Sequence, residues 1–195
     1  PIHPVEADFM KLVELPDAVA DLPKLGFFPG STIGNMIART SVDLLRFMRE
    51  TLGIGAQLLI GLDRVKEQQV LIDAYDDSAG VTAQFSLNLL DRINRELDGD
   101  IPVDKFRHVA IWNDDYARIE IYLEVQDDVS FSIDGTKHNL ISGQRIHIEN
   151  SHKFGLRDAR LMLRAGGWTP LCDWSDERDY FTLILAEAHP YKHAP

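Results

Sequence analysis

The sequence predicts an α/β protein, in which helices cover a parallel sheet and a subdomain of helices and antiparallel strands is inserted into the chain. Residues 25–30 and 58–62 are continuous apolar runs, and residues 41–52 between them carry apolar side chains at helical spacing. Strands that are apolar on both faces and joined by a helix are typical of parallel sheets. From residue 106 onward the apolar period becomes two, which is typical of antiparallel strands with one buried face.

The first part of the chain supplies the predicted parallel strands. Residues 5–9 are expected to form the tip of a strand, because they end on an acid followed by an aromatic side chain. Ser41 is expected to cap a helix that Gly53 ends. Ligands bind beyond the carboxyl ends of parallel strands, so the segments that follow these strands are candidates for a site. These segments are Asp8-Phe9, residues 30–35 and Asp63.

The inserted subdomain is predicted to begin with two helices, residues 70–75 and 82–97. The apolar side of the longer helix is made of Phe85, Leu89, Leu90, Ile93 and Leu97. In the strands that follow, the apolar positions Ile119, Ile121, Leu123 and Val125 alternate with the polar positions Glu120, Tyr122 and Glu124. Asp134-Gly135 is a strong signal for a hairpin turn, and residues 145–149 are predicted to form a further strand.

After the insertion the chain is predicted to return to the first sheet. Residues 156–165 read as a helix, and residues 168–174 and 180–186 as strands, the last of them antiparallel. The predicted domains are therefore residues 1–64 and 153–195 for the sheet and residues 65–152 for the insertion.

Composition excludes some partners and favours one compartment. The net charge is −11, from 31 acidic and 20 basic side chains, which disfavours nucleic acid and anionic membrane surfaces as partners. No apolar run approaches the roughly 20 residues of a membrane helix. Cys172 is the only cysteine, which indicates a reducing, cytoplasmic location and a buried thiol. The first residues, which carry neither a start methionine nor a signal peptide, read as a chain entered partway through.

Two loops are candidates for ligand contacts. In residues 30–35, Gly30 and Gly34 permit close backbone approach to a ligand, and Asn35 can donate and accept hydrogen bonds. In residues 74–80, Tyr75 offers a phenol to a polar ligand. The alternative is ordinary turn chemistry in both, with the hydroxyls, amides and carboxylates capping neighbouring helices.

The densest polar cluster is in residues 146–154. In an extended chain, Glu149 and Ser151 lie on one side, where a carboxylate and a hydroxyl can bracket a small planar group with two nitrogens. His147 and His152 fall on opposite sides of such a strand and no third ligand is evident, so a metal site is not expected.

Long segments of the sequence match one family in order. They are residues 28–35 (Phe-Pro-Gly-Ser-Thr-Ile-Gly-Asn), 74–82 (Ala-Tyr-Asp-Asp-Ser-Ala-Gly-Val-Thr), 92–97, 146–154 and 165–168. In these segments the chain resembles the histidine-specific, S-adenosylmethionine (SAM)-dependent methyltransferases of ergothioneine biosynthesis. The resemblance implies a Rossmann-like class I methyltransferase sheet with an inserted α+β substrate-binding subdomain, and transfer of methyl groups to the α-amino nitrogen of histidine.

The resemblance also implies roles for individual residues. Asn35 and Tyr75 hold the backbone groups of the amino acid, with Gly30 lining the approach. Glu149 and Ser151 grip the imidazole. The implied cofactor is SAM, and Asp8 and Phe9 are the acid and aromatic residue that contact its adenine. No general base is identified.

The chain departs from the family pattern at its start. The glycine-rich loop, the acid for the ribose hydroxyls and a further substrate-contacting tyrosine lie upstream of Asp8 in the family and are not in this sequence. The sheet is therefore expected to be incomplete on its N-terminal side, and this chain alone is expected to transfer little or no methyl. A missing N-terminal portion, or self-association, is expected to cover the exposed sheet edge. Two alternatives stay open: action on another amino acid or amine, and a non-catalytic substrate-binding fragment.

Overall fold

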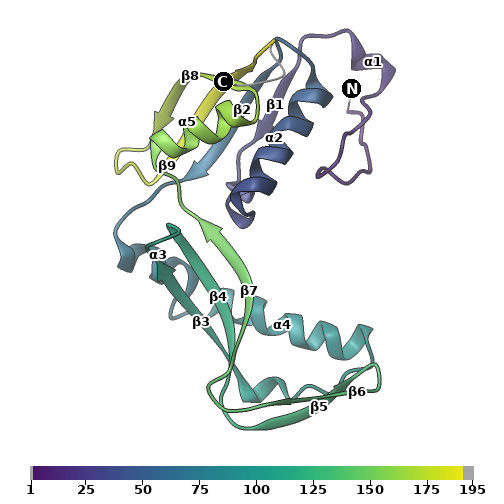
Figure 1. The fold of residues 1–195 in the computed structure, drawn as a ribbon, viewed down its shortest axis with the longest axis vertical. Helices are drawn as coiled ribbons and strands as arrows, with labels where there is room; N and C mark the ends of the chain where they lie inside the picture. Colours follow the sequence, from purple (N-terminus) through teal and green to yellow (C-terminus); the bar gives the residue numbers. More distant parts are fainter. Residues whose placement is uncertain (1, 191–195) are drawn as a thin grey trace. The chain divides into compact units, whose positions relative to one another are not determined.

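The computed structural model describes residues 2–190, which fold as two units (Figure 1). Among the described residues, the first unit takes residues 2–65 and 152–190, and the second takes residues 66–151. These limits fall next to the predicted domain limits, while the roles assigned to each domain stay a prediction. No helix in the described part of the chain is both long and apolar enough to span a membrane.

The first unit is built on a four-stranded sheet of order β1-β2-β9-β8. Its strands are β1 (Leu25–Phe28), β2 (Gln57–Asp63), β8 (Trp168–Ser175) and β9 (Phe181–Ala188). The pair β1–β2 is parallel, and β9 runs antiparallel to both β2 and β8. The parallel pair and the antiparallel last strand are both confirmed.

Two helices cover one face of this sheet: α2 (Ala38–Leu52) and α5 (Leu156–Ala165). Alternate residues of β2 and β9 point toward them, because side chains on a strand alternate between its faces. The buried core on this face consists of Ile33, Leu44, Leu45, Leu58, Ile60, Leu62, Ala159, Leu163, Trp168, Ile184, Ala186 and Ala188. The Trp168 indole is satisfied there by donating from Nε1 to the Leu45 carbonyl, 2.8 Å away. This helix-covered face confirms an α/β architecture.

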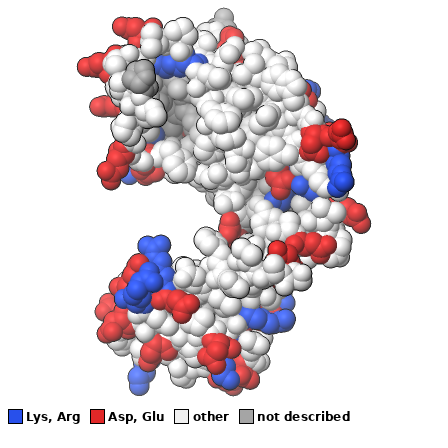
Figure 2. All heavy atoms as spheres, turned by 180° about the vertical axis from the view of Figure 1, so that it is seen from behind, with Lys and Arg blue, Asp and Glu red and all other residues white. Residues whose placement is uncertain are grey.

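The opposite face of the sheet is open. Phe27 on β1 is 65% exposed and Trp174 on β8 is also exposed. Seen from behind, this unit shows a broad surface with charges mainly at its rim (Figure 2). The prediction that β1 is buried on both faces is therefore wrong, as is that of a buried Cys172, which is exposed. Burial on the second face requires a covering layer, and no described element packs there.

Two local predictions at the start of this unit are also wrong. Residues 5–9 form no strand, since no described strand pairs with them. Among the described residues before β1, the only helix is the single turn α1 (Asp17–Ala20). Ser41 does not cap α2, which has Ile37 at its N-cap position. The buried Ser41 hydroxyl instead faces the carbonyls of Ile33 and Ile37, each at 3.3 Å.

The second unit is an α+β subdomain. Its helices are α3 (Gln68–Tyr75), α4 (Val81–Glu96) and the short turn η2 (Val103–Lys105). Its strands are β3 (Phe106–Asn113), β4 (Arg118–Val125), β5 (Val129–Ile133), β6 (Thr136–Leu140) and β7 (Arg145–His152). The strand order is β3-β4-β7, with β5–β6 as a separate hairpin. The predicted hairpin turn is confirmed, because Asp134 and Gly135 both have positive φ angles, 47° and 70°.

The core of the second unit corrects the predicted helix face. The predicted inner positions of β4, Ile119, Ile121, Leu123 and Val125, are all buried, as expected. On α4, however, Leu90 is buried while Phe85 is 73% exposed. The helix packs along Ser86, Leu90 and Ile93, a narrower stripe than the apolar residues alone suggest.

Arg49 joins α2 to the residue that follows β9. The buried guanidinium donates from Nε and Nη2 to the His189 carbonyl, at 3.1 and 2.7 Å. We expect Arg49→Met to lower the free energy of unfolding by about 1.5–3 kcal/mol, the usual contribution of hydrogen bonds to a charged group. The matched control is Arg46→Met on the same helix, where the exposed pair with Asp43 contributes about 1 kcal/mol or less. Urea denaturation measures the free energy of unfolding of both variants. An equal decrease in the two would contradict a stabilising role for the Arg49–His189 hydrogen bonds.

Candidate functional site

The loop of residues 30–35 stands at the carboxyl edge of the sheet, where β1 and β2 end. Ser31 adopts a left-handed conformation with φ 54°, and the turn η1 (Thr32–Asn35) follows it. The Asp63 backbone N–H donates to Ser31 Oγ at 2.9 Å, which joins the loop to the end of β2. The predicted meeting of this loop with Asp63 is confirmed. Gly30 and Asn35 both lie on the surface of this edge.

Gly34 holds this loop against the end of β7. A Cβ atom at Gly34 would lie 2.8 Å from the His152 carbonyl oxygen, closer than real contacts allow. His152 Nδ1 in turn lies 2.8 Å from the Gly34 carbonyl, which can only accept, so the ring donates from Nδ1. Gly34 is therefore needed for close backbone packing, and His152 positions the loop that carries Asn35.

A buried ion pair lies at the same edge and was not predicted. Lys153 Nζ is 2.8 Å from Asp63 Oδ2, and the Lys153 side chain is 1% exposed. The Phe154 backbone N–H also donates to the Asp63 carbonyl at 2.9 Å. Asp63 thus anchors the chain that follows β7 to the end of β2. Only the tertiary pairing reveals this role, since Lys153 in sequence is an ordinary polar residue of the cluster.

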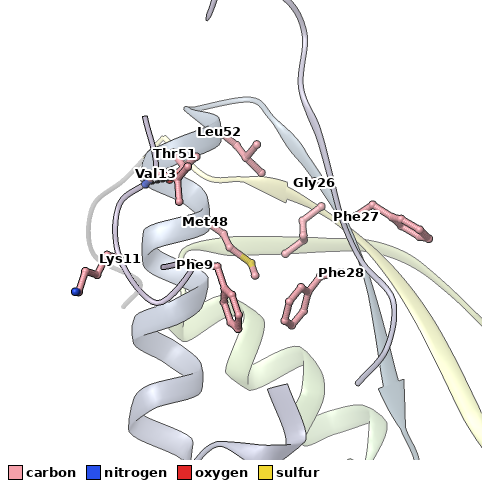
Figure 3. A pocket seen from close by; sticks show the side chains of 10 residues that line it. Phe9, Lys11, Val13, Gly26, Phe27, Phe28, Met48, Thr51 and Leu52 are labelled. Carbon is pink, nitrogen blue, oxygen red and sulfur yellow. Dashed lines mark hydrogen bonds between the residues drawn. The ribbon is translucent and has the colours of Figure 1, made fainter. Parts of the chain in front are cut away.

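Asp8 and Phe9 form a turn next to β1. The Met10 backbone N–H and the Lys11 ammonium, in that order of effect, hold the pKa of the Asp8 carboxyl below its usual value. The Phe9 ring lies 6.2 Å from the ring of Phe28, the last residue of β1. Both rings line an apolar cavity of about 140 Å³ together with Met48 and Leu52 of α2 (Figure 3). Phe9 therefore lies against the end of β1, while the role of Asp8 and Phe9 in binding adenine stays a prediction.

In the second unit, the structure brings together two predicted residues that are far apart in sequence. The Tyr75 hydroxyl at the end of α3 lies 2.7 Å from Ser151 Oγ on β7. Ser151 is buried, and Tyr75 is half-buried against the core of Leu71, Ala110 and their neighbours. Glu149 is half-buried on the same strand, two residues before Ser151. These three side chains are the ones that the sequence predicts for this part of the substrate site.

A second polar network occupies β4 of this unit. Glu120 was predicted to alternate toward solvent, but it is buried. The Tyr122 hydroxyl donates to Glu120 Oε2 at 2.5 Å, and Arg118 Nη2 donates to Oε1 at 2.6 Å. The hydrogen bond from Tyr122, followed by those from Arg118 and Asn113, lowers the pKa of Glu120, and the same bond raises the pKa of Tyr122. These partners keep the buried carboxylate ionised.

Metal coordination finds no support in the described residues. No group of three or more His, Cys, Asp or Glu side chains lies close enough there to hold an ion. His147 Nε2 instead contacts Asn150 Oδ1 at 2.9 Å.

Comparison with known proteins identifies the family. The model of the histidine-specific, SAM-dependent methyltransferases matches residues 1–188. A histidine N-alpha-methyltransferase of Mycolicibacterium smegmatis is 38% identical over 165 residues, which cover 84% of this chain and 51% of that protein. Ergothioneine biosynthesis protein 1 of Schizosaccharomyces pombe is 23% identical over 163 residues, covering 83% of this chain and 21% of that protein.

The solved structures to which this chain is similar include a SAM-dependent methyltransferase from Clostridium acetobutylicum. It has a TM-score of 0.47 at 9% identity and covers 94% of this chain and 63% of that chain. The chain spans about half the length of the curated histidine methyltransferases it matches. Since the family model matches nearly the whole chain, this protein belongs to the histidine-specific, SAM-dependent methyltransferase family.

Proposed function

We propose that this chain supplies the histidine-binding side of a SAM-dependent methyltransferase that methylates the α-amino nitrogen of histidine. The observation that carries the proposal is the contact between the hydroxyls of Tyr75 on α3 and Ser151 on β7, which lie 2.7 Å apart, with Glu149 on the same strand as Ser151. A neutral imidazole has one N–H donor and one acceptor nitrogen. The Glu149 carboxylate accepts from the N–H, and the Ser151 hydroxyl can donate to the other nitrogen while it accepts from Tyr75.

The first unit contributes to the same substrate in this proposal. Asn35, with both a donor and an acceptor, and Tyr75, whose phenol oxygen can accept while it donates to Ser151, hold the backbone groups of the amino acid. Gly30 lines the approach without a side chain. In this proposal the chain binds and orients histidine. Holding its amine in line with the methyl group lowers the free-energy barrier to methyl transfer. When bound, SAM supplies that methyl group as an electrophile.

The residues present fit only one part of SAM. The Phe9 and Phe28 rings and the apolar wall of the 140 Å³ cavity suit a planar purine, and the nearby Asp8 carboxylate suits its exocyclic amine. The cavity lining offers no acid for the ribose hydroxyls. We propose that a further polypeptide portion completes the cofactor site and covers the open sheet face. Self-association over the β1 edge is the alternative source of that cover.

The setting we propose for this reaction is the cytoplasm, since the chain has a single cysteine and therefore no internal disulfide. The partner is a small amino acid, and the net charge of −11 disfavours nucleic acid and anionic membranes.

Calorimetry on the full chain tests the proposal. We expect histidine to bind more tightly than glutamine or phenylalanine, because only histidine presents a ring N–H and a ring acceptor to Glu149 and Ser151. Equal affinity for all three would overturn the histidine assignment and favour another amine substrate. Histidine binding with no methylated product is the expected result for this chain alone, because its SAM site offers no acid for the ribose hydroxyls. A protein that binds histidine and still forms no product after the cofactor site has been completed would be the non-catalytic binding fragment.

Tyr75→Phe isolates the hydroxyl pair. The substitution keeps the ring in its packed position and removes only the hydroxyl that contacts Ser151. We expect the Kd for histidine to rise by about three- to tenfold, the usual effect of one lost hydrogen bond. Tyr116→Phe, at the exposed turn between β3 and β4, is the matched control and should leave the Kd unchanged.

A further inference from the structure

A buried histidine in the second unit contacts the backbone of Tyr75. His108 lies on β3 and is 8% exposed. Its Nε2 atom is 2.8 Å from the Tyr75 carbonyl oxygen, and its Nδ1 atom is 3.0 Å from Ser86 Oγ on α4. Ser86 is itself buried. Both ring nitrogens are therefore engaged by groups from two different helices.

The chemistry of these partners determines which ring nitrogen carries the proton in the neutral ring. A carbonyl oxygen can only accept, so Nε2 carries the hydrogen and donates to Tyr75. Nδ1 then accepts, and the donor is the Ser86 hydroxyl. The result is a directed chain of hydrogen bonds from α4 through the β3 histidine to the last residue of α3.

The series of hydrogen bonds ends at the C-terminus of α3, where the backbone carbonyls lack partners within the helix. The helix has only eight residues, too few to be stable alone, and the last carbonyls of a helix have no partner within it. The His108 ring supplies that partner for Tyr75, the residue whose phenol contacts Ser151. Tyr75 is thus held at its carbonyl by β3 and at its hydroxyl by β7.

Packing alone does not explain a histidine at this place. The inner positions of β3 and β4 around it are apolar, including Ala110 and Ile121. Burying an imidazole costs free energy unless both nitrogens are hydrogen-bonded, and a leucine would fill the space without that requirement. A leucine could not reproduce the hydrogen bond from the ring to the Tyr75 carbonyl.

We propose that His108, oriented by Ser86, is a positioning residue that sets the Tyr75 phenol against Ser151 and thereby the affinity of the chain for its amino acid substrate. The inference rests on the proposed function for its substrate, and on the hydrogen-bond geometry alone for the positioning of Tyr75.

Two substitutions at His108 separate positioning from packing. His108→Gln keeps an amide N–H near the place of Nε2, whereas His108→Leu keeps a similar volume and no donor. We expect His108→Leu to raise the Kd for histidine about tenfold and His108→Gln to restore it to within about threefold of the unsubstituted chain. Ser86→Ala, a smaller change that leaves the fold intact, should give an intermediate loss. His138→Leu on the exposed β6 is the matched control and should change nothing.

A spectroscopic measurement without ligand keeps the two hypotheses apart. In the full chain labelled with ¹³C at tyrosine Cζ, the Tyr75 resonance, assigned with Tyr75→Phe, reports the hydrogen bond of the phenol. It should shift in His108→Leu and return in His108→Gln, even if histidine turns out not to bind, an outcome that would reject the proposed function alone. An unmoved Tyr75 resonance in both His108→Leu and Ser86→Ala would overturn the positioning role. So would equal losses of affinity in the leucine and glutamine variants.

Discussion

Replacing Glu149 by alanine is expected to weaken histidine binding by about 1–3 kcal/mol, or roughly 5- to 150-fold in Kd. The Glu149 carboxylate is half-buried on β7. After its removal, little water could reach the imidazole N–H of a bound histidine to take the place of the carboxylate. Hydrogen bonds to a charged group in such a place contribute more than those between neutral groups. Calorimetric titration of the full chain with histidine measures the effect.

The Glu149 experiment has two comparisons. Glu149→Gln keeps the size and one acceptor oxygen, so it should lose less affinity than the alanine variant. Glu187→Ala, at an exposed position of β9, removes a carboxylate far along the sequence and should leave binding unchanged. An unchanged Kd in Glu149→Ala would reject the assignment of this carboxylate to the imidazole.

Gly61→Ala is expected to lower the free energy of unfolding by about 3 kcal/mol or more, at the upper end of the usual range for overpacked cores. A Cβ atom at this position of β2 would lie 2.0 Å from the Pro29 carbonyl oxygen and 2.8 Å from the Phe181 ring. The Pro29 oxygen belongs to the backbone that follows β1, so relief requires the strands to separate. Urea denaturation of the full chain measures the loss.

Gly30→Ala provides the stability control for Gly61. The nearest atom to a Cβ there is Thr32 Oγ1 at 3.7 Å, an ordinary contact on an exposed loop. We expect a change within about 0.5 kcal/mol, as for other surface substitutions. A similar free energy of unfolding for the two alanine variants would show that β1 and β2 can separate to accommodate the extra methyl group at little cost.

Most elements of the fold were predictable because their signals are local. The helix of residues 156–165 begins and ends as its apolar spacing and Gly166 predict. The Asp134-Gly135 turn follows from the ease with which these residue types adopt positive φ. The errors arose where a local pattern competes with distant contacts. Ser41 looks like a cap in sequence, but its hydroxyl donates to the carbonyls of Ile33 and Ile37, which precede α2. Phe85 looks like a core residue but is exposed.

The candidate site divides in the same way. Residue type, motif and family resemblance predict five substrate-binding residues: Gly30, Asn35, Tyr75, Glu149 and Ser151. Their assignment to a histidine substrate stays a prediction. Lys153 and His108 carried no usable signal, because a buried lysine and a buried histidine acquire their roles only from the partners that folding provides.

By itself, the sequence determined the order and type of most elements, the inserted subdomain and the family, because periodicity, turn chemistry and ordered motifs are all local features of the chain. Only the tertiary structure decided which sheet face is covered, that Glu120 is buried, and that Tyr75 meets Ser151 across 76 positions of sequence. The physical reason is that burial and hydrogen-bond pairing depend on which surfaces pack together, and packing joins residues that no local pattern connects.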